Sequence, residues 1–142
     1  MLFRSLHQTL ASGEEPETDP RTTRFFDALG EAMAASKRKV CLIAGVDLAH
    51  VGPRFGDPEP VGPAALARLE REDRAMLEAV AAVDSRAFYE SVAKDGDSRR
   101  ICGLSPIYTL LRCLPAGQGR LLRYAQWPDP QGVVTFASLV FE

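Results

Sequence analysis

The apolar run at residues 40–46 is the feature that most limits the fold of this chain. Its sequence, Val-Cys-Leu-Ile-Ala-Gly-Val, has the composition of a strand that is buried on both faces. An acid, a histidine and a Gly-Pro turn follow directly, at Asp47, His50 and residues 52–53. Proteins with α/β folds place their chemistry at the carboxyl ends of such strands. The run therefore predicts an α/β protein with a candidate site just after residue 46.

Helical and strand patterns alternate along the rest of the chain. Asp19 and Pro20 suit the cap and the first residue of a helix, and a longer amphipathic pattern covers residues 64–83. Near the end, residues 121–127 and 133–141 flank an Asp-Pro-Gln-Gly sequence that is typical of a type I turn. The last strand is apolar on both faces, so layers are expected on both sides of it. We predict an α/β/α sandwich with a mixed sheet and a C-terminal antiparallel hairpin, forming a single domain of residues 1–142.

Composition limits the location and the partners of the protein. The chain has 142 residues, 46% of them hydrophobic and 25% charged, as expected for a soluble domain with a real core. The net charge of -2 argues against nucleic acid as a partner, because phosphate binding needs a basic surface. The sequence contains neither a signal peptide nor an apolar run long enough to cross a membrane, so no membrane contact is expected. Three widely spaced cysteines do not suggest a disulfide framework, which favours a reducing, cytoplasmic location.

His50 is the first candidate site residue. An imidazole can bind a metal or transfer a proton near neutral pH, and Asp47 is close enough in sequence to orient it. The alternative is a loop histidine that hydrogen bonds merely hold in place. The sequence alone leaves both interpretations open.

Cys102 is the second candidate site residue. It precedes a helix that Ser105 and Pro106 are expected to start, as the cap and the first helical residue. The partial positive charge of a helix N-terminus, together with Arg99 and Arg100, favours the thiolate, which is the form that binds metals and attacks substrates. A Cys-Gly pair before a helix can also be no more than a tight turn.

The other histidine and the other cysteines are predicted to have no chemical role. His7 lies in an amphipathic helix with no acidic neighbour, and we expect it to serve packing or the surface. Cys41 lies inside the apolar run, and Cys113 lies on an apolar helix stripe. Both are predicted to be inert core thiols.

The two candidate segments together carry a family resemblance. Val-Asp-Leu-Ala-His50-Val-Gly-Pro-Arg-Phe55, followed later by Ile-Cys102-Gly-Leu-Ser-Pro106-Ile, resembles the Memo family, also called AmmeMemoRadiSam system protein B. The strand pair with Tyr124-Ala-Gln and Phe136-Ala-Ser adds to the match. The resemblance covers nearly the whole chain, but it corresponds only to the later half of a usual family member.

The resemblance implies a fold similar to that of class III extradiol dioxygenases, with an iron or copper site at the end of the sheet. In such a site His50 corresponds to a histidine of the active-site pocket and Cys102 to a metal ligand. Asp47 corresponds to the acid that precedes the histidine. The family's other metal histidines come from an earlier segment without a counterpart here, so the metal site is expected to be a remnant or to be completed by a partner.

Three functions from different classes follow. The first is a metal-dependent oxidoreductase in which His50 acts as acid or base. The second is a non-catalytic binding or scaffold module associated with a radical-SAM protein, as the family name suggests. The third is a metal-free enzyme in which Cys102 is the nucleophile and His50 the base. We also expect a homo-oligomer, or a chain that supplies the missing half, because half a sandwich exposes apolar sheet surface.

Overall fold

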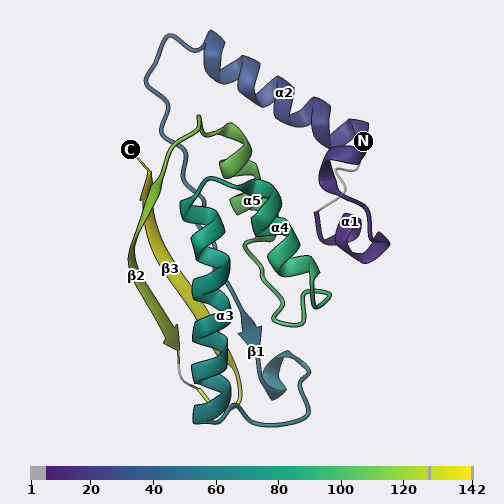
Figure 1. The fold of residues 1–142 in the computed structure, drawn as a ribbon, viewed down its shortest axis with the longest axis vertical. Helices are drawn as coiled ribbons and strands as arrows, with labels where there is room; N and C mark the ends of the chain where they lie inside the picture. Colours follow the sequence, from purple (N-terminus) through teal and green to yellow (C-terminus); the bar gives the residue numbers. More distant parts are fainter. Residues whose placement is uncertain (1–5, 128, 142) are drawn as a thin grey trace.

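The computed structural model describes residues 6–127 and 129–141, and it combines helices with a small sheet (Figure 1). The α/β class predicted from the sequence is confirmed. None of the helices in these residues is both long and apolar enough to cross a membrane. In chain order the elements are α1 (Leu6–Ser12), the short 3-10 helix η1 (Pro16–Thr18), α2 (Pro20–Ala35), β1 (His50–Val51), the 3-10 helix η2 (Pro53–Phe55), α3 (Pro63–Ala81), α4 (Ser85–Ala93), α5 (Leu104–Cys113), β2 (Gly119–Trp127) and β3 (Val133–Phe141).

The three strands have the order β1-β3-β2. The predicted C-terminal hairpin of β2 and β3 is confirmed, and its turn has the expected bonds. The backbone N–H of Gly132 donates to the carbonyl of Asp129, and that of Gln131 donates to its carboxylate, both at 2.9 Å. Both strand pairings in the described residues are antiparallel. The prediction of a mixed sheet is therefore wrong for these residues.

Residues 40–46 do not form the predicted buried strand. They are irregular, and Ile43 is 86% exposed. Pairing with β3 stops where Thr135 meets two residues at once: it accepts from the backbone of Leu48 at 2.8 Å and donates to the carbonyl of Ala49 at 3.0 Å. Such a bulge bends a strand away from its partner. The apolar composition is that of a buried strand, but a strand also needs a neighbour to bond, which composition cannot supply.

An apolar cavity of about 660 Å³ lies where the strand was expected. Residues 40–44 line it together with residues 137–141 of β3, and α3 and α5 contribute further side chains. The segment therefore runs near β3 without completing the sheet.

The two faces of the sheet have different surroundings. Val133 and Thr135 of β3 are fully buried beneath the helices. On the opposite face Phe136 is 42% exposed, and Trp127, which pairs with Val134, is 64% exposed. Helices α3, α4 and α5 lie to one side of the hairpin in Figure 1. The expectation of layers on both sides of the last strand is therefore wrong for the described residues, because no helix among them reaches the second face.

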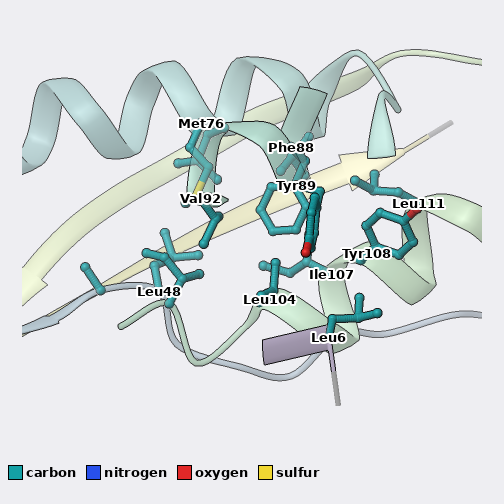
Figure 2. Close-up of a cluster of buried hydrophobic side chains, with 14 of the residues drawn as sticks. Leu6, Leu48, Met76, Phe88, Tyr89, Val92, Leu104, Ile107, Tyr108 and Leu111 are labelled. Atoms are coloured by element: carbon teal, nitrogen blue, oxygen red, sulfur yellow. The ribbon is translucent and has the colours of Figure 1, made fainter. Parts of the chain in front are cut away.

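Helix ends follow the local signals in the sequence. Asp19 caps α2 by accepting from the backbone of Arg21 at 2.9 Å, and Asp84 caps α4 by accepting from Ala87 at 2.9 Å. The helices then pack their apolar stripes into one core (Figure 2). All five α-helices of the described residues, β3 and the segment before β1 contribute to it. Figure 2 labels Leu6, Leu48, Met76, Phe88, Tyr89, Val92, Leu104, Ile107, Tyr108 and Leu111.

Candidate functional site

The structure brings the two candidate segments side by side. The backbone N–H of His50 donates to the carbonyl of Arg99 at 2.7 Å, and that of Cys102 donates to the carbonyl of Leu48 at 3.1 Å. These bonds join the end of the irregular segment to the loop that precedes α5. The two segments therefore meet as the sequence analysis expects, and the sharing of one metal by their side chains stays a prediction.

The imidazole of His50 has a defined orientation. Its Nδ1 atom lies 3.2 Å from the carbonyl oxygen of Leu48. Because a carbonyl oxygen can only accept, the neutral ring carries its proton on Nδ1 and keeps its lone pair on Nε2. The ring of Phe55 packs edge-on against it, with centroids 5.0 Å apart. A backbone carbonyl on one ring nitrogen is the usual support for a histidine whose other nitrogen binds a metal or a proton.

The thiol of Cys102 is exposed in front of α5. The helix begins at Leu104 with Gly103 as its cap, so it starts earlier than the predicted Ser105 cap and Pro106 first residue. Ser105 lies inside the helix, and its hydroxyl oxygen accepts from the backbone N–H of Leu6 at 3.1 Å. Cys102 therefore remains directly before the first residues of the helix.

Gly103 explains how the loop approaches the irregular segment so closely. A Cβ atom at this position would lie 2.8 Å from the carbonyl oxygen of Asp47 and 2.8 Å from the side chain of Ile107. Only glycine fits without movement of one of these neighbours. In the Cys-Gly pair, Gly103 therefore allows the close contact with Asp47, while Cys102 exposes its thiol.

Asp47 is exposed at the same junction. Its carboxylate has no hydrogen bond or ion pair with any residue in 6–127 or 129–141, and the Leu48 carbonyl takes the place beside Nδ1 that the sequence suggests for Asp47. Its predicted catalytic role stays a prediction.

His7 has an acidic neighbour that the sequence does not reveal. The sequence shows no acidic neighbour, but the fold places Asp97 at 3.8 Å from its Nε2 atom. The same atom lies 3.1 Å from the carbonyl oxygen of Ile101, directly before Cys102. Asp97 also accepts from the backbone of Ile101 at 2.7 Å, and burial raises the pKa of this carboxyl group. Helix α1 thus packs on the Cys102 loop through contacts between residues that are remote in sequence.

The two other cysteines differ from each other. Cys41 is exposed, so its prediction as a core thiol is wrong, for the same reason that residues 40–46 do not form a strand. Cys113 is half-buried, and burial raises the pKa of its thiol. A raised pKa favours the protonated thiol, and the predicted inertness of Cys113 stays a prediction.

A buried polar network beneath the site is absent from the sequence-based analysis. Asp73 of α3 is fully buried. One carboxylate oxygen accepts from Arg99 at 2.7 Å, and the other accepts from Thr135 at 2.6 Å and from Tyr124 at 2.9 Å. Burial raises the pKa of Asp73, while these donors act in the opposite direction. The available signal was an acid at helical spacing among the apolar residues Leu69, Met76, Leu77 and Val80.

This network connects directly to the candidate site. Thr135 accepts from the backbone of Ala49 at 2.9 Å, and the carbonyl of Arg99 accepts from His50. The Asp73–Arg99 ion pair and Thr135 are therefore bonded to both the segment before β1 and the loop before α5. No comparable contact is visible from the spacing of these residues in the sequence.

The donors for a metal are incomplete in the part of the chain that the structure describes. No group of three or more histidine, cysteine or acidic side chains there is placed to hold a metal ion. His50 and Cys102 are two donors, whereas protein metal sites commonly use three or four. The described residues alone therefore do not fit a complete iron or copper site.

Fold and site together define an α/β protein with a histidine and a cysteine on adjoining segments at the edge of a small antiparallel sheet. A family model described as Memo-like protein matches residues 16–140. The chain therefore belongs to the Memo-like protein family, and the resemblance seen in the sequence is confirmed. No curated protein matches the chain.

Proposed function

We propose that this Memo-like chain supplies half of a metal site, with His50 and Cys102 as its ligands and with the remaining ligands from another polypeptide. The observation that carries the proposal is the Leu48 carbonyl, which receives both the backbone N–H of Cys102 and Nδ1 of His50. This arrangement leaves the imidazole Nε2 lone pair free beside a loop with an exposed thiol. Imidazole and thiolate together suit iron, copper or zinc.

The proposed reaction class is metal-dependent oxidoreduction of the extradiol dioxygenase type. If the metal is held by Cys102 and the partner's ligands alone, Nε2 of His50 would instead hold or transfer a proton, since Nδ1 is occupied by the carbonyl. Asp47 would act as a second acid or base at the exposed junction. The described residues contribute too few donors for the reaction without a partner.

Metal loading tests this proposal. The chain would be loaded with iron, copper or zinc and its metal content measured, in parallel with Cys102→Ser and His50→Gln. Cys41→Ser is the matched control, because both thiols are exposed. Partial occupancy that falls in both site variants and stays unchanged in the control is expected. Full, tight occupancy that survives Cys102→Ser would refute the ligand assignment.

A second candidate function is a non-catalytic scaffold that binds a partner, with a radical-SAM protein as the proposed class. The uncovered sheet face, which carries Trp127 and Phe136, favours it. Calorimetric titration with such a protein distinguishes the two functions. A scaffold would lose binding in Phe136→Ser and keep it in Cys102→Ser.

The third function, a metal-free cysteine enzyme, has a separate test. If His50 activates Cys102, the thiol reacts with iodoacetamide faster than the exposed thiol of Cys41. The difference would disappear in His50→Gln. Equal rates for the two thiols would exclude this reading.

A further inference from the structure

We infer that Arg100 is a positioning residue, which fixes His50 relative to Cys102 by a clasp on the backbone of residues 50–52, formed by its bonds to the His50 carbonyl and to Asp57. One guanidinium nitrogen, Nη1, donates to the carbonyl of His50 at 3.2 Å. The other, Nη2, donates to Asp57 at 2.7 Å. The second oxygen of Asp57 accepts from the backbone N–H of Gly52 at 2.6 Å. Arg100 and Asp57 therefore hold residues 50–52 at both ends.

The backbone at Arg100 has an unusual conformation that permits this clasp. Its φ is 53°, in the left-handed region that residues other than glycine rarely adopt. The turn lies between two bonds to the histidine segment, from His50 to Arg99 and from Cys102 to Leu48. A left-handed backbone is unfavourable for such a residue and persists where surrounding contacts compensate for it. Here the backbone N–H of Arg100 donates to the carbonyl of Asp97 at 2.8 Å, and the bonds of Arg99 and Cys102 to the histidine segment hold the turn on either side.

The contribution of the clasp is geometric more than energetic. The side chains of Arg100 and Asp57 are 40% and 31% exposed, and ion pairs of that kind add little to stability. The hydrogen bond from Arg100 is the largest cause that lowers the pKa of Asp57, and the hydrogen bond from the Gly52 backbone is the next largest. The carboxylate therefore stays ionised and keeps both donors. A planar guanidinium with two separate acceptors sets direction as well as distance.

The consequence concerns the imidazole. With residues 50–52 held, Nδ1 stays on the Leu48 carbonyl and the lone pair stays on Nε2, next to the loop that carries Cys102. Loss of the clasp would let the ring leave that carbonyl, so that the proton moves to Nε2 in part of the population. The use of this tautomer for metal binding rests on the proposed function, but the tautomer itself does not.

The test is the tautomer ratio of His50, measured by long-range proton–nitrogen NMR at alkaline pH, where a free imidazole is neutral. His7→Gln identifies which signals belong to His50. We expect mainly the Nδ1–H form in the unaltered chain. In Arg100→Ala the ratio of Nδ1–H to Nε2–H should fall roughly two- to tenfold, which is the range that the net loss of one hydrogen bond produces.

Three further variants make the outcome decisive. Arg100→Lys should restore part of the ratio, because lysine keeps the charge but lacks the paired donors. Asp57→Asn should lower the ratio, and it decides the question if Arg100→Ala does not fold. Arg54→Ala is the control, since it breaks an ion pair with Asp129 in the same loop without contacting His50.

An unchanged ratio in both Arg100→Ala and Asp57→Asn would overturn the inference, as would an equal fall in Arg54→Ala. No metal is present in this experiment. A failure of the proposed metal site would therefore leave the ratio as expected, and a failure of the clasp would be seen even if metal binds.

Discussion

The backbone N–H of Cys102 donates to the carbonyl oxygen of Leu48 at 3.1 Å, which joins two segments that are far apart in the sequence. The same oxygen lies 3.2 Å from Nδ1 of His50. One backbone atom thus orients the histidine and fixes the loop of the cysteine.

Replacement of Gly103 by alanine should separate the two segments. The added methyl group would lie 2.8 Å from the carbonyl oxygen of Asp47, so one of the two backbones must move. We expect a loss of about 1–3 kcal/mol in the free energy of unfolding, as for other overpacked positions. Urea unfolding followed by circular dichroism measures it. Gly45→Ala is the matched control, because its new Cβ meets no atom within 4 Å, and equal losses in both variants would refute the steric explanation.

Removal of one partner of the Asp73–Arg99 ion pair should lower the free energy of unfolding much more than replacement of both partners by apolar residues. Asp73→Asn leaves the buried guanidinium without its carboxylate, and we expect a loss of about 3–5 kcal/mol. The double variant Asp73→Leu with Arg99→Met should recover most of that loss, because neither charge remains buried. Thermal and urea unfolding provide the values.

The matched control for this ion pair is Glu72→Gln on the same helix. Glu72 is exposed and lies 3.8 Å from Arg68, so its loss should change stability by less than about 0.5 kcal/mol. If Asp73→Asn is equally mild, the network does not support the fold as described.

Asp97 should make the protein less stable as pH rises above the ordinary aspartate value of 3.8. Burial raises its pKa, so the folded state holds a proton that the unfolded state has already released. The stabilisation is complete below the ordinary value and is lost as pH rises through the raised one. Asp97→Asn removes this titration and can still accept from Ile101, so its unfolding free energy should fall less over the same pH range.

Urea unfolding at several pH values from 4 to about 7 tests this sign, within the range where carboxyl groups titrate. Asp27→Asn, an exposed carboxyl of α2, is the control and should follow the unaltered chain. A steeper fall in Asp97→Asn than in the unaltered chain would show that the direction is wrong.

Self-association through the uncovered sheet face is a further prediction. Trp127 and Phe136 leave large apolar side chains in solvent on this face. We expect a dimer whose dissociation constant rises about tenfold or more in Phe136→Ser, since removal of a buried aromatic commonly costs more than 1.4 kcal/mol. Light scattering over a concentration series measures it, with Ile43→Ser as a control at an exposed apolar residue outside the strands. A monomer at micromolar concentration that binds no apolar dye would contradict the prediction.

Local signals in the sequence predicted the local structure. The cap at Asp19 and the turn at Asp129 each depend on a few adjacent residues, and each appears in the structure. The family resemblance placed His50 and Cys102 in one site, and their segments meet in the structure.

Contacts between remote residues were not predictable in the same way. Residues 40–46 have the right composition for a strand but turn away from β3 after the bulge at Thr135. The partners of His7 and Asp73 come from other elements, so sequence spacing carries no information about them. Such features depend on which surfaces the tertiary fold brings together.

The most direct test of the central claim is a double-mutant cycle for metal affinity at His50 and Cys102. Zinc affinity would be measured by competition with a chromophoric chelator for the unaltered chain, His50→Gln, Cys102→Ser and the double variant. If the two side chains bind one ion, each single variant should lose about tenfold or more, and the two losses should not add, because the second ligand is weakened once the first is gone. Losses that add independently, or single variants that bind as tightly as the unaltered chain, would show that His50 and Cys102 do not share a metal.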